Sequence, residues 1–424
     1  MTRNRRFALF VALATLACTD TTLAPDAWLV PSLAMDVGKH HTVVVNPNAS
    51  GNGIAATIQE GIDMVEAGGK VQIKAGTYVE ALLINKGLTL EAIGDGSEPV
   101  IIAPPGAPTT AVEVATSEAV FIRDVTVRVS GPNGVLGNGV VDVTAERVTL
   151  LAVNPPLGVG QLIAVANNAS LTGGRARLVV RESFLDGAVP LANSGTPPFP
   201  QMFGIRPSGD VDALIERNVV RHMGGACIHV VMRADLGGET NADVIGNDLD
   251  ECYPLGRAGA LLIGTAAGGL PLPGPATATG VVNIMGNTIR NSRGSCLTTS
   301  AINYEFFSGR IERNRIPSAV AACAFPSARV LPAGIWVGSI RGLPATTVVV
   351  RFNDIVGNAQ AGLRIGPNQT TALEARCNWY GAASGPSGVG TGTGDALVVQ
   401  PGAATPVFAP FATAPIAGTG ATGC

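Results

Sequence analysis

The sequence predicts an all-β solenoid, in which similar coils of short strands stack along one axis. The first observation is that the chain past residue 70 alternates apolar and other residues in runs of three to five, such as 71–73, 88–90 and 125–127. Strands this short need neighbours above and below. The second observation is an asparagine that recurs after a short strand at spacings of 29, 40, 27, 39 and 25 residues. Such spacing is typical of one coil per repeat, with longer loops extruded from some coils.

The composition excludes several other classes of protein. Of the 424 residues only 14% are charged, against about 25% in an ordinary soluble domain, and the net charge is −3. These values exclude a disordered chain and a polybasic nucleic-acid-binding protein, and 54 glycines with 29 prolines do not suit a helical bundle. Past residue 17 no run of about 18 apolar residues is free of Gly, Pro or charge, which excludes a polytopic membrane protein.

The N-terminus has the pattern of an export signal. Three arginines within residues 3–6 precede a short apolar run that ends at Ala17, so residues 1–17 are predicted to be a cleaved signal peptide. Residues 15–18 resemble the bacterial lipoprotein cleavage box, which predicts lipidation of Cys18 and a location at the outer membrane, cell surface or periplasm. The membrane would be contacted only through this anchor. The alternative is an ordinary signal peptide whose cysteine lies there. Residues 18–40 lack periodicity and are predicted to be a flexible tether.

One helix is predicted at the start of the folded region. Ile54, Ile58, Ile62 and Val65 recur at helical spacing, which predicts a helix over residues 54–66 that ends at Gly68–Gly69.

The recurring asparagines predict the corners of the coils. Asparagine tolerates left-handed backbone angles, and its side-chain amide can hydrogen-bond to the asparagine of the next coil. The six instances are Asn218, Asn247, Asn287, Asn314, Asn353 and Asn378.

A second column begins at glycines that open another strand of each coil. Alternate residues of a strand point to opposite sides, so the residue directly after each glycine should face the core and the next one should face outward. The expected core residues are Ile205, Ala226, Ala260, Ile335 and Leu363, and the expected outward residues are Arg206, Cys227, Leu261, Trp336 and Arg364.

A family resemblance covers residues 42–412. Residues 57–63, 76–80 and 88–90 resemble the opening of right-handed parallel β-helix proteins of the pectin-lyase-like class, including pectinesterases. Residues 377–381, 384–386 and 408–411 resemble the terminal coil of bacterial β-helix repeat proteins. The resemblance implies a single-stranded right-handed parallel β-helix over residues 41–380 with an N-terminal capping α-helix, and a C-terminal cap and tail over 381–424. It does not fix the function, because the class includes lyases, hydrolases, esterases, epimerases, adhesins and catalytically silent members.

No complete catalytic motif of that class is present, so whether the protein is an enzyme is left open. If it is one, a polysaccharide lyase or a glycoside hydrolase is expected. Of the neighbouring His222 and His229, the second is the candidate base because it should point outward. Asp248 and Asp250 are the candidate carboxylates, within a group that includes Asp243 and Glu251. The alternative is that these are ordinary polar corner and surface residues. No cofactor or metal is expected, and calcium at the carboxylates is the exception left open.

The outward column predicts a binding surface. Arg206, His229, Arg233, Trp336 and Arg364 fall on or beside one strand position of the coils. Guanidinium groups bind carboxylates and an exposed indole can stack on a sugar ring, which suits an acidic polysaccharide or a cell-envelope glycan. The interpretation is a monomeric, exported protein that binds extracellular polysaccharide, with processing of the bound polymer left open. The alternative is a non-catalytic adhesin or structural envelope protein, with these residues as scattered solubilising charge.

The cysteines predict three disulfides. Seven cysteines less the lipidated Cys18 leave six, which can pair completely in an exported chain. One coil of advance brings the chain back to about 5 Å, within the range that a disulfide spans. The expected pairs are Cys227–Cys252, Cys296–Cys323 and Cys377–Cys424.

Overall fold

The computed structural model describes residues 40–94, 100–153, 159–167, 173–188, 201–232, 238–252, 260–265, 279–292, 300–317, 333–338, 347–358, 360–416 and 424. The predicted signal peptide, Cys18 and the predicted tether up to residue 39 lie outside the described residues. So do Arg233 and the predicted pair Cys296–Cys323. Residues Gly38–Cys424 form one compact unit.

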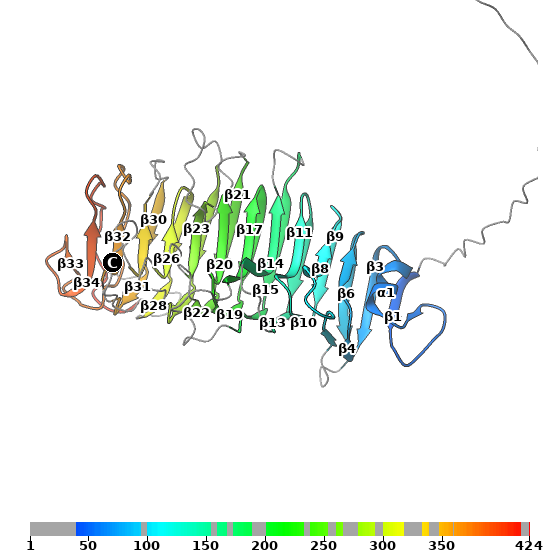
Figure 1. Cartoon of the computed structure of the whole chain (residues 1–424). Coiled ribbons are helices and arrows are strands. Elements are labelled where there is room, and N and C mark those ends of the chain that lie inside the picture. The colour runs from blue at the N-terminus through cyan, green and yellow to red at the C-terminus, as the bar shows by residue number, and fades with distance from the viewer. Residues whose placement is uncertain are drawn as a thin grey trace, which may run out of the picture. The chain divides into compact units, whose positions relative to one another are not determined.

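The described strands form three long parallel sheets, and each coil adds one strand to each sheet in turn (Figure 1). Sheet A contains β1 (His40–Val45), β2 (Ile54–Ala55), β3 (Val65–Lys74), β6 (Leu88–Ile93), β9 (Ala119–Arg123), β12 (Asp142–Glu146), β15 (Ala176–Arg181), β18 (Val211–Glu216), β21 (Thr240–Ile245), β24 (Val281–Met285), β27 (Ser308–Glu312) and β30 (Val348–Arg351). Sheet B contains β4 (Gly76–Tyr78), β7 (Val100–Ile102), β10 (Thr126–Val129), β13 (Thr149–Ala152), β16 (Phe184–Asp186), β19 (Val219–Met223), β22 (Asp248–Cys252), β25 (Thr288–Arg290), β28 (Arg315–Pro317) and β31 (Asp354–Val356). Sheet C contains β5 (Leu82–Ile84), β8 (Thr110–Val114), β11 (Asn133–Asn138), β14 (Val159–Asn167), β17 (Gln201–Gly209), β20 (Ile228–Met232), β23 (Leu261–Thr265), β26 (Ile302–Tyr304), β29 (Ile335–Val337), β32 (Leu363–Ile365), β33 (Pro386–Gly388) and β34 (Gly394–Val399).

This architecture is a right-handed parallel β-helix, and it confirms the predicted fold class. Strand alternation places one apolar column of each sheet inside the coil. In sheet B, for example, Leu150 pairs with Val127 on one side and with Leu185 on the other, and all three side chains are fully buried. Stacking the same position at coil spacing of about 4.8 Å removes each apolar side chain from water without requiring long strands.

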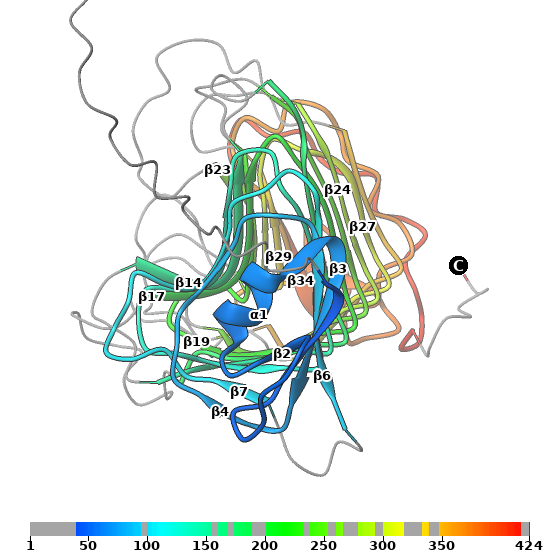
Figure 2. The same ribbon diagram turned by 90° about the vertical axis from the view of Figure 1, so that its right-hand side faces the viewer.

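Helix α1 (Ile58–Met64) lies across the N-terminal end of the coils, as Figure 2 shows. It is shorter than the predicted 54–66 because Thr57 caps it by accepting a hydrogen bond from the Glu60 N–H, and because Val65 already has an extended backbone. The carboxylate of Glu80 accepts the N–H groups of Ile58 and Gln59 at 2.8 and 2.9 Å. The glycines expected to end the helix lie inside β3. In the described part of the chain no helix has the length and apolar character to cross a bilayer.

The C-terminal end of the solenoid extends beyond the predicted boundary at residue 380. Strand β34 pairs with β32, so sheet C continues to Val399. Leu397 is fully buried, and Phe408 and Phe411 pack against the core. Residues 381–411 therefore contribute β33, β34 and a hydrophobic cover to the solenoid.

The predicted asparagine column exists and forms a continuous ladder between sheets A and B. All six side chains are buried. Except in Asn378, which ends the ladder, each amide nitrogen donates to the Oδ1 of the next asparagine along the axis, for example Asn247 to Asn287 at 2.9 Å and Asn287 to Asn314 at 3.0 Å. The left-handed residue of this corner is the one before the asparagine, such as Arg217 with φ 52° and Gly246 with φ 63°. The asparagine thus stabilises the corner through the hydrogen bonds of its side-chain amide, and the left-handed backbone angle belongs to the residue before it.

Two disulfides lie within the described residues, and both are predicted pairs. Cys227–Cys252 has a Cα–Cα distance of 5.6 Å and Cys377–Cys424 one of 5.4 Å. The first joins two successive coils, and the second fastens Cys424 to the coil that ends the asparagine ladder.

Candidate functional site

The predicted outward column lies on the outer face of sheet C. His229 pairs with Leu262, Asn303 pairs with Trp336, and Trp336 pairs with Arg364 across successive strands. Arg206 lies beside His229 between the paired positions of β17 and β20. The register was wrong in two coils, because Cys227 and Leu261 belong to the core, whereas Ala226 packs on the outer side with Phe203 and Leu262.

This column is not the exposed surface that the sequence predicted. The exposed fractions of His229, Trp336 and Arg364 are 0%, 0% and 6%. The indole of Trp336 packs with Ala333 and Ala361, and a Cβ added to Gly366 would lie 2.4 Å from the indole. The small residues around the strand therefore leave room for the buried indole. Burial also lowers the pKa of the Arg364 guanidinium below its ordinary value.

Arg206 and His229 are also engaged in packing. The guanidinium of Arg206 lies 5.5 Å from the centre of the Phe203 ring, and its Nη1 donates to Gln161 Oε1 at 3.1 Å. The ring of His229 lies 5.3 Å from the same Phe203 ring. These contacts hold both side chains against the outer face of sheet C.

The three catalytic candidates do not come together. His229 is on β20 of sheet C, whereas Asp248 and Asp250 are on β22 of sheet B. Arg290 donates to both oxygens of Asp248 at 2.8 and 2.9 Å and lies 3.7 Å from Asp250. The predicted group is also divided, because Asp243 is on β21 of sheet A. Asp248 and Asp250 are thus charge-paired along the outside of sheet B.

A groove at the corner between sheets B and C brings different titratable side chains together. The Nδ1 of His222 lies 3.0 and 3.1 Å from the two carboxylate oxygens of Asp186, and its Nε2 lies 3.4 Å from Glu251 Oε2. The imidazole therefore connects three successive coils. We call this site the B–C groove. It has a volume of about 570 Å³ and is lined by Leu151, Ala152, Val153, Asp186, Ala188, His222 and Glu251.

The electrostatics of the B–C groove fix the proton on one imidazole nitrogen. Burial would raise the pKa of Asp186, but hydrogen bonds from the Ala188 N–H, His222 and Arg221 outweigh it and hold this pKa below its ordinary value. An ionised carboxylate accepts hydrogen bonds only. Nδ1 of His222 must therefore carry the proton that faces Asp186, while its Nε2 faces Glu251 Oε2.

The backbone at this corner is left-handed in several coils. The φ angles of Ala188, His222, Glu251 and Asn291 are 54°, 53°, 51° and 47°. Because the conformation recurs from coil to coil, it belongs to the turn of the solenoid and is no special strain at His222. Its effect is to place the side chains of His222 and Glu251 one above the other at the edge of sheet B.

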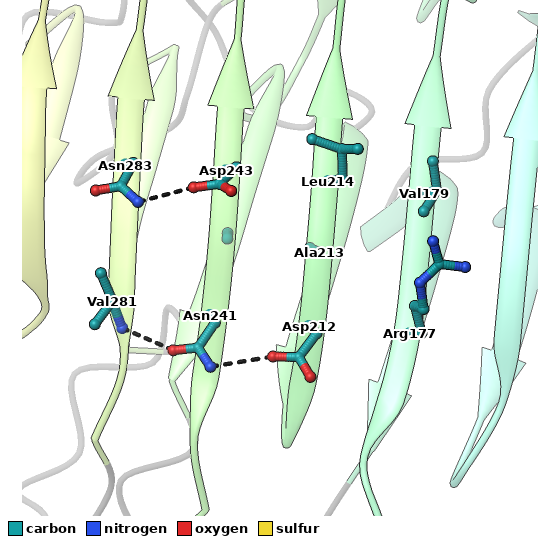
Figure 3. A pocket seen from close by; sticks show the side chains of 10 residues that line it. Arg177, Val179, Asp212, Ala213, Leu214, Asn241, Asp243, Val281 and Asn283 are labelled. Carbon is teal, nitrogen blue, oxygen red and sulfur yellow. Dashed lines mark hydrogen bonds between the residues drawn. The ribbon is translucent and has the colours of Figure 1, made fainter.

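A second groove lies on the outer face of sheet A (Figure 3). We call it the sheet A groove; it has a volume of about 300 Å³ and crosses strands β15, β18, β21 and β24. Its polar side chains bond to one another along the axis. Asn241 donates to Asp212 at 3.0 Å, Asn283 donates to Asp243 at 2.8 Å, and Asn241 Oδ1 accepts the Val281 N–H at 2.9 Å. Val179 and Leu214 form its apolar part.

Within the described residues, no group of three or more His, Cys, Asp or Glu side chains is placed to hold a metal ion. Calcium at the carboxylates stays an untested expectation.

The comparisons with known proteins support the fold of the chain and do not show a family. No family model matches the chain. No curated protein matches its sequence. Among solved structures it is similar to the Dettilon tailspike protein, with a TM-score of 0.52 and 14% identity over 85% of this chain and 68% of that one. It is also similar to the catalytic domain of a GH87 α-1,3-glucanase in complex with tetrasaccharides, with a TM-score of 0.48 and 14% identity over 92% and 69% of the chains. The likeness to the tailspike supports the β-helix fold.

The sequence contains a signal for the B–C groove that is separate from the outward column. His222, Glu251 and Asn291 each lie four residues after a ladder asparagine, namely Asn218, Asn247 and Asn287. Counting from the ladder would have placed all three in one column.

Proposed function

We propose that the protein binds extracellular polysaccharide in the B–C groove. The observation that carries the proposal is the pairing of an apolar wall, formed by Leu151, Ala152 and Val153, with the hydrogen-bonding groups of His222 and Glu251 in one open groove. A sugar ring presents an apolar C–H face and a polar rim, so it needs both kinds of surface. The volume of about 570 Å³ is in the range of small-ligand sites.

A polymer fits this face better than a single small molecule. Polar side chains continue from the groove along the outside of sheet B, with Asp250 in the coil of Glu251 and Arg290 in the next coil. Asn291 donates to Asp250 at 2.8 Å in the same column as Glu251. A ligand that runs along the axis would meet a polar side chain in each of these coils, about every 4.8 Å.

The cellular setting belongs to the same proposal. Residues 1–17 would direct export and Cys18 would carry the lipid anchor. The two disulfides support an oxidising compartment. The main evidence for an acidic polymer as the ligand no longer applies, because Arg364 and the neighbouring Trp336 are buried.

Cleavage of the bound glycan is a second candidate function, which the contact between Asp186 and His222 favours. A carboxylate that fixes the tautomer of an imidazole leaves the other nitrogen free to act as a general base. His222→Gln should then abolish product formation even at saturating polysaccharide, where weaker binding no longer limits the rate. If no polysaccharide yields product with the parent, the non-catalytic adhesin or envelope function is the remaining interpretation.

The binding proposal is tested by placing a charge on the apolar wall. Val153→Asp should lower the affinity for the bound polysaccharide at least tenfold, because a sugar face would lie against a hydrated carboxylate. The matched control is Val281→Asp, at an exposed valine of the sheet A groove, which should leave the affinity unchanged. Affinity electrophoresis against a panel of neutral, acidic and amino polysaccharides measures both. Equal loss in the two variants, or loss only in the control, would overturn the proposal.

A further inference from the structure

The two ends of the solenoid, which lie at opposite ends of the row of coils in Figure 1, are covered by segments of different character. At the N-terminal end, helix α1 and the start of β3 carry the exposed charged side chains of Glu60, Asp63 and Lys70. At the C-terminal end, residues 377–424 contain a single charged side chain, that of Asp395. The terminal coils of a repeat protein need a polar outer surface to remain soluble as separate molecules. The N-terminal end has such a surface, and the C-terminal end has very little charge from which to build one.

The charge of Asp395 is used within the protein. Its Oδ2 accepts hydrogen bonds from the backbone N–H of Asn358 at 2.7 Å and from the side-chain amide of Asn358 at 3.3 Å. Burial raises the pKa of this carboxyl group above its ordinary value. The described residues of the C-terminal cover therefore present almost no charge to the solvent.

Apolar side chains are exposed where two of the sheets end. Val389 directly follows β33, the terminal strand of sheet C, and Val407 extends sheet A beyond β30 by pairing with Glu374. The exposed fractions of the two valines are 42% and 48%. Their backbone N–H groups donate to Leu397 O at 3.0 Å and to Leu373 O at 2.8 Å, which fixes both residues in place. Further exposed apolar residues of this segment are Ala409, Pro410, Ala414 and Pro415. We call the six exposed apolar residues together the C-terminal face.

The chemistry of the C-terminal face indicates what can cover it. A charged partner surface would lose its hydration there without meeting an opposite charge. Segments that lie on a bilayer surface combine apolar residues with Lys or Arg, and residues 377–424 contain neither. The same face of a second copy is apolar as well, and two neutral faces do not repel each other when a patch meets itself. A second copy of the chain is therefore the partner that complements this face.

We propose that the C-terminal face is an interface through which two copies of the chain associate end to end. A twofold contact pairs a patch with itself, so Val389 and Val407 of both copies become buried in the dimer. The sequence predicted a monomer, and the proposal replaces that expectation. The proposal is independent of the polysaccharide site, because the B–C groove lies on the coils of β13, β16, β19 and β22, whereas the C-terminal face follows the last strands of the solenoid.

Sedimentation velocity of the full-length chain over a hundredfold range of concentration tests the proposal. Every protein in the test carries Cys18→Ser, so that no lipid contributes to association. The parent should show a reversible equilibrium between monomer and dimer. Val407→Asp should weaken dimerisation at least tenfold, because the dimer would bury carboxylates without partners. The matched control is Val79→Asp, at a valine directly after β4 that is 67% exposed, and it should leave dimerisation unchanged.

A charge swap distinguishes a second copy from any other partner. Val407→Lys should also weaken dimerisation when it is present alone. An equimolar mixture of Val407→Asp and Val407→Lys should associate at least tenfold more tightly than either variant alone, because opposite charges then lie in the two faces that meet. Circular dichroism checks that the variants fold. If the changes at Val407 disturb folding, Val389→Asp and Val389→Lys take their place in the same experiment.

Each outcome supports or overturns the proposal. A parent that stays monomeric over the whole range overturns it, and so does equal weakening in Val79→Asp or a mixture that associates no better than its components. Species larger than a dimer overturn the twofold contact. A monomeric parent that floats with phosphatidylcholine vesicles, and no longer does so as Val407→Asp, would assign the face to a lipid surface and also overturn the proposal. Failure of every polysaccharide to bind would overturn the proposed function and leave the dimer standing.

Discussion

The two corners that bound sheet B differ in whether one residue type repeats from coil to coil. At the corner with sheet A the same residue recurs, and each buried asparagine satisfies the backbone and side chain of its neighbours, as Asn287 does with Asn247 and Asn314. At the corner with sheet C the residue changes with every coil, from His222 to Glu251 to Asn291, and the side chains are half-buried. A column of identical residues maintains the coil, whereas a column of different residues on the same scaffold forms a site.

The covalent link beside the B–C groove is expected to have the largest effect of the changes considered. Cys252 follows Glu251 directly, and its disulfide to Cys227 joins the coil of Glu251 to that of His222. The double variant Cys227→Ala/Cys252→Ala should lose about 3–4 kcal/mol of unfolding free energy, the chain-entropy value for a loop of 25 residues. Urea unfolding followed by circular dichroism measures it.

The same variant sharpens the comparison of the two corners. Amide hydrogen exchange should quicken around residues 222–228 and 248–252 and stay slow at the asparagine ladder of the neighbouring coils. Uniform quickening over all coils would show that the disulfide supports the whole solenoid and not this groove.

The asparagine ladder should respond next most strongly. Asn287→Ala removes the acceptor for two hydrogen bonds of Asn247 and the donor to Val244 O, all of them buried. We expect a loss of about 2–3 kcal/mol of unfolding free energy, because buried polar groups are left without partners. The control is Asn291→Ala, which has the same side chain at the other corner and is half-buried. A loss as large in the control as in Asn287→Ala would contradict the distinction between the corners.

Asp186 should give the smallest stability effect, and that effect depends on pH. Its folded-state pKa lies below the value of about 3.9 for an unfolded aspartate. The stability it contributes is therefore present above about pH 5 and is lost as the pH falls through the lowered folded-state value. Asp186→Asn should lower the free energy of unfolding by about 1–2 kcal/mol near neutral pH. In acid the variant and the parent should be equally stable.

The ladder supplies the control for this pH dependence. Asn287→Ala changes only uncharged groups, so its deficit should be the same at pH 7 and at pH 4. If the loss of unfolding free energy in Asp186→Asn did not change with pH, the shape of the Asp186 side chain and not its charge would explain its contribution.

The sequence predicted those features that repeat and missed those that depend on what lies outside the coil. The asparagines were found because one register position keeps one residue type over six coils. The column of Arg206, Trp336 and Arg364 was also real, but its burial depends on packing outside the sheet, such as that of the Trp336 indole against Gly366. The ends of α1 were missed because they depend on Thr57 and on Glu80, which is distant in sequence. The B–C groove changes residue from coil to coil, so no residue type repeats there and only the count from the ladder asparagines locates its column.

The most direct test of the account is a crystal structure of the protein with a bound oligosaccharide taken from the polysaccharide that it binds. The account predicts a sugar ring against Val153 with its polar rim at His222 and Glu251, and the oligomer extending along the outside of sheet B. An oligomer bound instead in the sheet A groove, with the B–C groove in contact only with solvent, would contradict it.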